Sequence, residues 1–240
     1  MAEFYREDLA YIHDVGHADF ALRSAPGILR ILGENAIPDG LIVDLGCGSG
    51  LWARELLRAG YRVLGIDISE AMVEIAREKA PGAEFRVGSL FEAPIPPCDA
   101  VTAVSEVLNY LFDRENEERG LERVFGRAYE ALRPGGVFVF DVLGPGQVPG
   151  GKIRGFSMGP DWAVLNEKEE EAGKMERRIV SFRKVGDLYR RTDEVHRVKL
   201  YGSDEITADL RRAGFEVRTL RAYGDHPLGE NHAAFVARRP

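Results

Sequence analysis

Short apolar runs alternate with amphipathic segments from Leu41 onward, a pattern typical of strands and helices that build a mostly parallel sheet. The apolar runs predict strands at 41–45, 62–66, 84–88, 98–104 and 136–142. Apolar positions at helical spacing predict helices at 51–59, 70–79 and 115–132. Ser69 can cap the second helix, and Pro81 and Pro134 end the second and third helices. Each helix can therefore cover a face of the sheet.

The pattern changes after the fifth strand. Residues 143–160 are rich in glycine and proline, which is the composition of a loop. Three longer stretches come next at 162–171, 174–185 and 188–201, and the short turns between them predict antiparallel hairpins. Residues 203–213 predict a helix that ends at Gly214, and 215–221 and 232–238 predict two last strands. The sum is a seven-strand sheet with a three-strand antiparallel insert before its last helix.

The N-terminal segment differs from the rest of the chain. Residues 4–36 have a helical pattern but contain Gly16, Pro26, Gly27 and Gly33, so we expect two or three short helices over the edge or mouth of the sheet. No clean linker separates this segment from the first predicted strand, and 240 residues suit one hydrophobic core. We therefore expect a single domain.

Composition and charge narrow the function classes. Hydrophobic residues make up 45% and charged residues 30% of the chain, which is the balance of a soluble globular protein. No apolar segment is long enough to span a bilayer and the N-terminus lacks a signal-peptide pattern, so we expect a cytoplasmic protein. Cys47 and Cys98 are too few for a disulfide framework. The formal net charge of -7, with dispersed basic residues, argues against a broad nucleic-acid surface.

The sharpest chemical signal is the segment 43–50, VDLGCGSG, where an apolar strand turns into a helix. Glycines at 46, 48 and 50 let the backbone turn tightly and approach a ligand with no Cβ in the way. The turn comes after a strand, at the edge where open α/β sheets bind their ligands. A dinucleotide site needs a third glycine three residues after the second, but Leu51 occupies that position. S-adenosylmethionine has no phosphates and needs no such fit.

A carboxylate ends the second strand, about 20 residues after the first glycine. Asp67 can accept hydrogen bonds from both hydroxyls of a ribose, which nicotinamide and S-adenosylmethionine sites both require. The alternative for Asp67 is a helix N-cap near Ser69, which the upstream glycine motif disfavours. Asp67 therefore indicates an adenosine ribose more clearly than it indicates which cofactor carries it.

Five segments carry a resemblance to a known family. DLGCGSG, GIDIS followed by Met72, FRVGSLFE, CDAVTAVSEVLNYL and LRPGGVFVFDV resemble, in order and spacing, the motifs of class I S-adenosylmethionine-dependent methyltransferases of the small-molecule type. The resemblance implies an α/β fold, a Rossmann-like seven-strand sheet with an antiparallel last strand and helices on both faces. It also implies S-adenosyl-L-methionine across the carboxyl ends of the first, second and fourth strands. The single methyltransferase domain would comprise an N-terminal helical lid (1–37), a cofactor-binding core (38–142), a loop and antiparallel insert (143–202) and a C-terminal completion of the sheet (203–240).

The same resemblance implies individual cofactor contacts. Gly46 and Gly48 would line the methionine end of the cofactor, and Asp67 would hold its ribose. The adenine would meet apolar side chains and the segment after the third strand, while the segment after the fourth strand would lie beside the reacting centre. Many family members carry an acid where this chain has Ser89, and a hydroxyl or backbone group could substitute for it here. The expected cofactor residues are Asp44, Gly46, Cys47, Gly48, Asp67, Ile68, Met72, Ser89, Leu90, Ser105 and Glu106.

Methyl transfer from a sulfonium is an in-line displacement, which requires alignment, exclusion of water and, for an amine or hydroxyl acceptor, removal of a proton. Asn109 and Tyr110 come after the fourth strand at the functional rim, where they could touch substrate or simply pack. His196 has the intrinsic pKa of a base, although a structural hydrogen bond is the alternative role. Tyr201 lies an odd number of residues away, so a regular strand points the two side chains to opposite faces. We take His196 and Tyr110 as the catalytic candidates.

The first predicted helix carries further polar and aromatic candidates. His13 and His17 share a helix face, a spacing that could hold a metal, but no further ligand cluster accompanies them, so we expect no metal. A lid helix whose polar residues face the cofactor is the favoured interpretation. Tyr5 and Tyr11 could cap the cofactor or be core contacts. We take Tyr11 and His17, together with Asn109, as substrate or lid residues.

The sequence therefore predicts transfer of a methyl group to a nitrogen or oxygen acceptor, less readily carbon, on a small molecule. A methyltransferase for protein or RNA is disfavoured by the acidic charge and by an insert that can cover a pocket. A nicotinamide oxidoreductase is disfavoured by Leu51, and a non-catalytic S-adenosylmethionine-binding protein by the intact glycine motif and Asp67. The expected partners are a small-molecule substrate, no nucleic acid and no membrane, with a monomer or homodimer. We expect the N-terminal segment and the insert to roof the substrate chamber, with 143–160 as a mobile rim.

Overall fold

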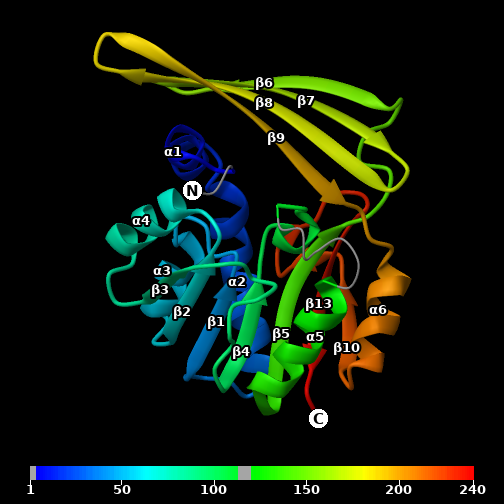
Figure 1. Ribbon diagram of the computed structural model, residues 1–240. Helices are drawn as coiled ribbons and strands as arrows, with labels where there is room; N and C mark the ends of the chain where they lie inside the picture. The colour runs from blue at the N-terminus through cyan, green and yellow to red at the C-terminus, as the bar shows by residue number, and fades with distance from the viewer. Residues whose placement is uncertain (1–3, 113–119) are drawn as a thin grey trace.

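The computed structural model describes residues 4–112 and 120–240 (Figure 1). Its centre is a seven-stranded sheet in the order β10-β13-β5-β4-β1-β2-β3. β13 runs antiparallel to its neighbours on both sides, while the pairs among β5, β4, β1, β2 and β3 are parallel. The expected seven-strand sheet with an antiparallel last strand is therefore confirmed. The strands are β1 (Leu41–Leu45), β2 (Arg62–Asp67), β3 (Glu84–Val87), β4 (Cys98–Ala103), β5 (Leu132–Leu143), β10 (Glu216–Leu220) and β13 (His232–Arg238).

Helices cover both faces of this sheet (Figure 1). Alternate strand positions supply two apolar layers, so Ile42 packs in one core and Val43 in the other. The core that holds Val43 is closed by α5 and α6, and the core that holds Ile42 by α2, α3 and α4. The helices are α1 (Glu7–Gly16), α2 (Asp19–Glu34), α3 (Leu51–Arg58), α4 (Glu70–Lys79), α5 (Gly120–Ala131) and α6 (Ser203–Arg212), with a short 3-10 turn, η1, at Val107–Asn109. The predicted start of the third helix, before 120, lies outside the described residues.

The N-terminal segment forms two helices. α1 and the first residues of α2 lie at the mouth of the sheet, whereas the rest of α2 packs on one sheet face. α2 is 16 residues long, continues through Pro26 and buries Ile28, Ile31 and Leu32 against the sheet face. The expectation that 4–36 lies over the edge or mouth therefore agrees with α1 and the start of α2, and it is wrong for the rest of α2. Its amphipathic stripe is wide enough to join the second core, and that burial outweighs the internal proline.

The insert is a sheet of its own, in the order β6-β7-β8-β9, that arches over the carboxyl edge of the main sheet (Figure 1). It comprises β6 (Lys152–Met158), β7 (Trp162–Glu171), β8 (Lys174–Val185) and β9 (Leu188–Lys199). The expected three hairpin strands are present, but the expectation that all of 143–160 is loop is wrong. β6 pairs with β7 through its backbone while nearly all of its side chains are exposed, so no buried stripe marked it in the sequence.

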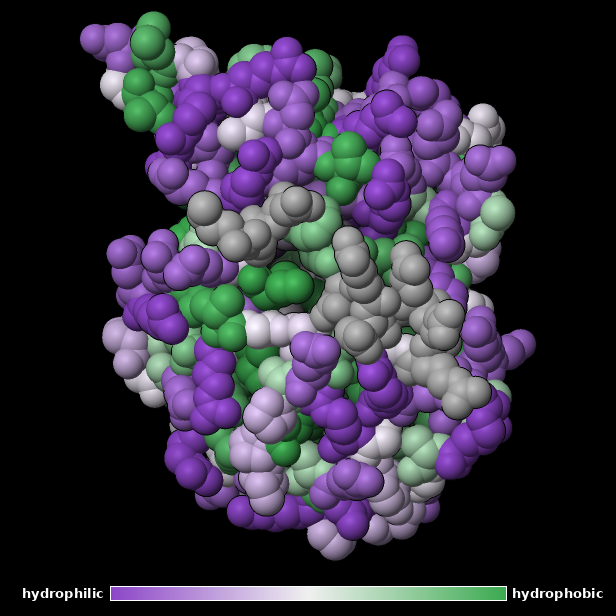
Figure 2. Space-filling view, viewed as in Figure 1, coloured by the Kyte–Doolittle hydropathy of each residue, from purple (hydrophilic) through white to green (hydrophobic). Residues whose placement is uncertain are grey.

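The insert returns to the main sheet close to where it leaves. The backbone amide of Tyr201 donates to the Leu143 carbonyl, which joins the two ends of the insert. A small ribbon of β11 (Ala222–Tyr223) and β12 (His226–Pro227) comes after β10. Among the described residues, no helix combines the length and the apolar character needed to cross a membrane. The space-filling view shows a mostly hydrophilic surface on the insert, interrupted by exposed apolar side chains, and a hollow with apolar side chains at its mouth between the insert and the main sheet (Figure 2).

Candidate functional site

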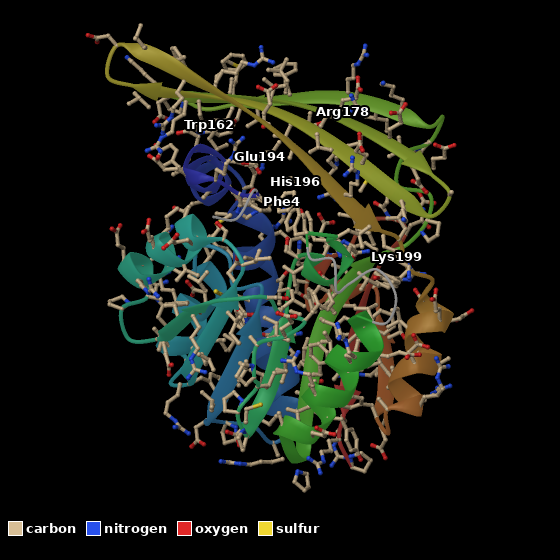
Figure 3. The ribbon with its side chains drawn as sticks, viewed as in Figure 1. Phe4, Trp162, Arg178, Glu194, His196 and Lys199 are labelled. Atoms are coloured by element: carbon tan, nitrogen blue, oxygen red, sulfur yellow. The ribbon has the colours of Figure 1, made fainter. Side chains whose placement is uncertain are left out.

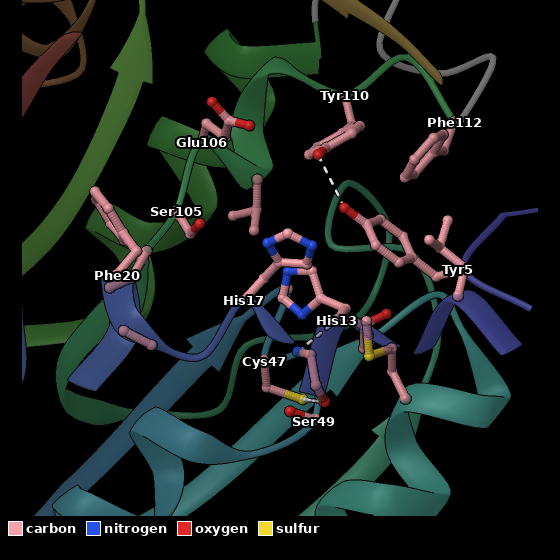
Figure 4. A pocket seen from close by; sticks show the side chains of 18 of the residues that line it. Tyr5, His13, His17, Phe20, Cys47, Ser49, Ser105, Glu106, Tyr110 and Phe112 are labelled. Atoms are coloured by element: carbon pink, nitrogen blue, oxygen red, sulfur yellow. Dashed lines mark hydrogen bonds between the residues drawn. The ribbon is translucent and has the colours of Figure 1, made fainter. Parts of the chain in front are cut away.

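A chamber of about 680 Å³ lies between the carboxyl edge of the sheet, α1 and the inner face of the insert. This volume is in the range of small-molecule and cofactor sites. Every residue of the predicted cofactor set lines it, as do Tyr110 and His17 (Figure 4). Residues that lie far apart in the sequence thus meet around one cavity.

The glycine turn forms the floor beside β1. Gly46, Gly48 and Gly50 all have left-handed backbone angles, with φ values of +70°, +51° and +76°, which favour glycine. A Cβ on Gly46 would lie 2.8 Å from Val107, so a larger residue would also clash there. A Cβ on Gly48 would meet no atom within 4 Å, so the turn leaves open space at this glycine. The turn therefore fits a ligand that approaches the backbone closely.

Asp67 joins the glycine turn to the next helix. One carboxylate oxygen accepts a 2.8 Å hydrogen bond from the Gly48 amide, and the other accepts a 2.9 Å bond from the Ser69 amide. Ser69 itself caps α4, because its hydroxyl oxygen accepts from the Met72 amide, as the sequence predicted. Burial raises the pKa of the Asp67 carboxyl, against these backbone hydrogen bonds. Asp67 thus braces the turn while it remains on the chamber wall.

Asp44 lies at the end of a buried hydrogen-bond chain under the glycine turn. The Trp52 indole donates to the Thr102 hydroxyl at 3.1 Å, and that hydroxyl donates to Asp44 at 2.7 Å. Burial raises the pKa of Asp44 to about 7, opposed by the Thr102 hydrogen bond and assisted by the negative charge of Asp67. The chamber floor therefore holds a carboxyl group that exchanges a proton near neutral pH.

The segment after β4 is fixed by a buried acid on β5. Ser105 and Glu106 have φ values of +72° and +57°, unusual for residues other than glycine. Their two amides donate to the Asp141 carboxylate at 2.8–3.2 Å, which stabilises this conformation. The imidazole of His232 also contacts Asp141, with 3.3 Å between Nε2 and Oδ2. Asp141 thus holds the strained backbone of Ser105 and Glu106 on the chamber wall.

His232 is a functional candidate that sequence reasoning missed. It begins β13 and lines the chamber, and Phe20 stacks on it with 5.5 Å between ring centroids. Burial lowers the pKa of His232, but the hydrogen bond and charge of Asp141 outweigh that effect and raise it above its usual value. No motif in the sequence marks the pair, because the two residues come from different strands.

A second polar network spans the roof and the rim. Arg177 on β8 donates to the Glu106 carboxylate at 2.6 Å and to the Tyr110 hydroxyl at 3.0 Å. The Tyr110 and Tyr5 hydroxyls are 3.0 Å apart (Figure 4). Burial raises the pKa of Tyr110. The positive charge of Arg177 lowers it and the negative charge of Glu106 raises it, but burial is the largest effect, so the phenol stays protonated at neutral pH. Tyr110 can therefore orient a ligand but is a poor proton acceptor.

Three predicted residues do not line the chamber. His196 is fully buried, and its Nε2 lies 2.8 Å from the Glu194 carboxylate (Figure 3). Asn109 bonds the backbone of Leu143 and Lys199, so it ties the rim to both ends of the insert. Tyr11 donates to Asp161 at 2.7 Å and joins α1 to the insert. Each of the three makes a structural hydrogen bond.

Tyr201 packs in the main core with α6, whereas His196 belongs to the inner face of the insert. His13 is half-buried on the chamber wall, and desolvation, followed by the charge of His17, lowers its pKa to about 4. The ring centroids of His13 and His17 are 6.1 Å apart. Within 4–112 and 120–240, no group of three or more His, Cys, Asp or Glu side chains is arranged to hold a metal ion.

Comparison with known proteins agrees with this geometry. Residues 42–136 match a family model described as a methyltransferase domain. A protein of Geobacillus sp. (strain WCH70) named as a methyltransferase is 30% identical over 200 residues, which cover 75% of this chain and 76% of that protein. The dTDP-4-amino-2,3,4,6-tetradeoxy-D-glucose N,N-dimethyltransferase of Saccharopolyspora spinosa is 28% identical over 233 residues, 90% of this chain and 88% of that protein.

A solved structure extends the likeness to the whole fold. The crystal structure of an S-adenosylmethionine-dependent methyltransferase from Clostridium acetobutylicum ATCC 824 superposes with a TM-score of 0.82 at 20% identity, covering 98% of each chain. Its coverage includes the insert and the N-terminal helices as well as the glycine-turn core. The chain belongs to the class I S-adenosylmethionine-dependent methyltransferases, and its cofactor is S-adenosylmethionine.

Proposed function

We propose that this enzyme methylates a nitrogen or oxygen atom of a small molecule held in the chamber. The observation that carries the proposal is His232, which lines a cavity that the insert covers and contacts the buried Asp141 carboxylate behind it. An amine or hydroxyl acceptor must lose a proton during methylation, and a histidine supported by a carboxylate is suited to take it. A carbon acceptor would need further activation, for which the described residues offer no comparable argument.

The chemistry divides between the cofactor and the chain. Bound S-adenosylmethionine supplies an electrophilic methyl group. With Nε2–H of His232 donated to Asp141, Nδ1 is the free acceptor, and it has no hydrogen-bond partner among the residues described. Asp141 holds the ring orientation and stabilises the imidazolium that forms when the acceptor proton arrives. Tyr110 and the Glu106–Arg177 pair border the same space and can orient the acceptor by hydrogen bonds.

The proposed cofactor contacts come from the family resemblance. Gly46 and Gly48, with Asp44 and Cys47 nearby, would line the methionine end, and Asp67 would accept from the ribose hydroxyls. Apolar packing on the adenine would come from Ile68 and Met72. Their common position around one chamber supports these roles, as does the open space beside Gly48.

The covered chamber favours a small acceptor over a protein or RNA. α1 and the inner face of the insert contribute much of the lining, and the chain has a net charge of -7. The Saccharopolyspora relative matches nearly the whole chain, and its name describes methylation of an amino sugar. An amine on a polar, sugar-sized molecule is therefore the first acceptor to test.

Incubation of the purified enzyme with methyl-labelled cofactor and a metabolite extract would test the proposal. We expect label in one or a few small molecules, and NMR of the product should place the new methyl group on nitrogen or oxygen. Parallel incubations with cellular protein and RNA serve as controls. Label found only in those macromolecules would contradict the proposed function.

A further inference from the structure

Two cations face each other in the roof of the chamber. Lys168 on β7 and Arg177 on β8 are direct partners in the strand register, so their side chains leave the same face of the insert. Both residues line the chamber. Like charges directly opposite each other destabilise a strand pair unless something compensates them. The chamber roof therefore concentrates positive charge where the acceptor is expected.

Only one of these two charges is compensated by the protein. The Arg177 guanidinium donates to the Glu106 carboxylate at 2.6 Å. Lys168 forms no ion pair or hydrogen bond with any residue in the described ranges, and Asn166, two residues earlier on the same face, also forms no side-chain hydrogen bond there. On the opposite face of the insert, by contrast, Lys152 and Arg154 both pair with Glu167.

The unpaired Lys168 is also partly shielded from water. Burial, followed by the positive charge of Arg177, lowers the pKa of its ammonium group, with Glu106 acting in the opposite direction. Glu106 is already paired with Arg177, so it leaves Lys168 without a close counter-charge. Burying a charge without a partner is costly, so an anion in the chamber would relieve both the burial and the cross-strand repulsion. Lys168 and the Asn166 amide both offer N–H donors to such an anion.

We propose that Lys168, with Asn166 beside it, binds an anionic group of the methyl acceptor, either a carboxylate or a phosphate. A lysine ammonium suits either group because it acts as a compact charge with several donors. The proposal rests on the proposed function, since it assumes that the acceptor enters this chamber. It narrows the substrate class to small molecules that carry a nucleophilic nitrogen or oxygen and a separate negative charge.

Anion titration of the enzyme saturated with S-adenosylhomocysteine tests this site without relying on activity. Inorganic pyrophosphate, inorganic phosphate and acetate are titrated separately by calorimetry, which distinguishes a phosphate site from a carboxylate site. Lys168→Met should weaken binding of the preferred anion by about tenfold or more, whereas Lys168→Arg should retain most of it. Lys184→Met is the matched control, because Lys184 is an exposed lysine on the same sheet. It should bind the anion as the wild type does.

The affinity for S-adenosylhomocysteine is measured in parallel for each variant. If Lys168→Met binds anions as well as the wild type, the site is wrong. If it loses affinity for S-adenosylhomocysteine instead, Lys168 holds the carboxylate of the cofactor and the proposal is also overturned. Anion binding that depends on Lys168, in an enzyme that methylates no small molecule, would support the anion site and contradict only the proposed function.

Discussion

The backbone amide of Tyr5 donates a 2.7 Å hydrogen bond to the Glu194 carboxylate, which joins the N-terminal segment to β9. The Arg6 amide donates to the other oxygen at 3.1 Å, and His196 contacts the same carboxylate at 2.8 Å (Figure 3). The same segment is also joined to the start of α4, because the Ser69 hydroxyl donates to the Tyr5 carbonyl at 2.8 Å. The N-terminal segment therefore bridges the insert and the start of α4, next to the proposed ribose site at Asp67.

Replacing Glu194 with alanine should loosen this bridge. The change removes the acceptor for two backbone amides, and hydrogen bonds to charged groups are each worth about 1.5–3 kcal/mol. We expect faster amide exchange in residues 5–16 and a fall in methyl-transfer kcat/KM of about tenfold or more, because an open roof admits water. Asp193→Ala, at the exposed neighbouring carboxylate, is the control. Unchanged exchange in the Glu194 variant would show that the N-terminal segment is held by other contacts.

Removal of the His232 imidazole should lower kcat by a larger factor than it weakens substrate binding. General base catalysis contributes roughly 10²–10⁴-fold, so His232→Gln should lower kcat by about that factor. Because Asp141 raises the pKa of His232, the wild-type rate should rise with pH through a value above the usual 6.5 as the base loses its proton. Asp141→Asn should lower kcat and move this rise in rate, the acid limb of the pH profile, to lower pH.

A matched control exists for this experiment. His226 also contacts the Phe20 ring, at 5.4 Å, but is not among the residues that line the chamber. His226→Gln should keep the wild-type rate and pH profile. An unaltered acid limb in His232→Gln would rule out His232 as the base.

Asp67→Ala should weaken binding of S-adenosylmethionine. Loss of charged hydrogen bonds to the ribose, at about 1.5–3 kcal/mol each, corresponds to about one to several tenfold steps in affinity. Since Asp67 also holds the Gly48 and Ser69 amides, we expect an additional loss of about 1–3 kcal/mol in the free energy of unfolding. Titration calorimetry and thermal unfolding measure the two effects separately. Glu70→Ala, at an exposed carboxylate at the start of α4, is the control and should keep the wild-type cofactor affinity. Normal binding by the Asp67 variant would reject the ribose assignment.

The elements that sequence predicted well are those with a buried stripe or a glycine motif. β1, the glycine turn and β2 could be predicted directly from apolar runs and the spacing of the glycines, so the cofactor side of the chamber could be named before the structure. β6 could not, because its side chains are exposed and only its backbone pairing defines it. The local hydrophobic pattern therefore predicts strands with a buried face, but it does not reveal an exposed edge strand such as β6.

The substrate side of the chamber depended on long-range placement. Arg177 and Arg178 are adjacent on β8, and the register with β7 decides which of them faces the chamber. A strand with charges on both faces does not reveal that register. His232 and Asp141 lie 91 residues apart and meet only because β13 pairs with β5. The isolated intrinsic pKa that suggested His196 as a base carries no information about such neighbours.

The raised pKa of Asp44 predicts a pH dependence of stability in the protein without cofactor. An ordinary aspartate titrates at 3.8 in the unfolded chain, whereas Asp44 in the folded state titrates at about 7. Between these values the folded state holds a proton that the unfolded state releases, so stability is lost as pH rises from about 4 to about 7. Three pKa units correspond to at most about 4 kcal/mol.

Asp44→Asn should remove this loss, because the amide is neutral throughout and can still accept the Thr102 hydrogen bond. Other groups titrate in the same range, and His13, with its pKa lowered to about 4, changes stability in the opposite direction. The measured quantity is therefore the difference in the free energy of unfolding between variant and wild type at each pH. That difference should grow in favour of the variant by about 2–4 kcal/mol between pH 4 and pH 7. Asp225→Asn, at an exposed position, should track the wild type. A constant difference across the range would mean that Asp44 is already ionised in the folded protein.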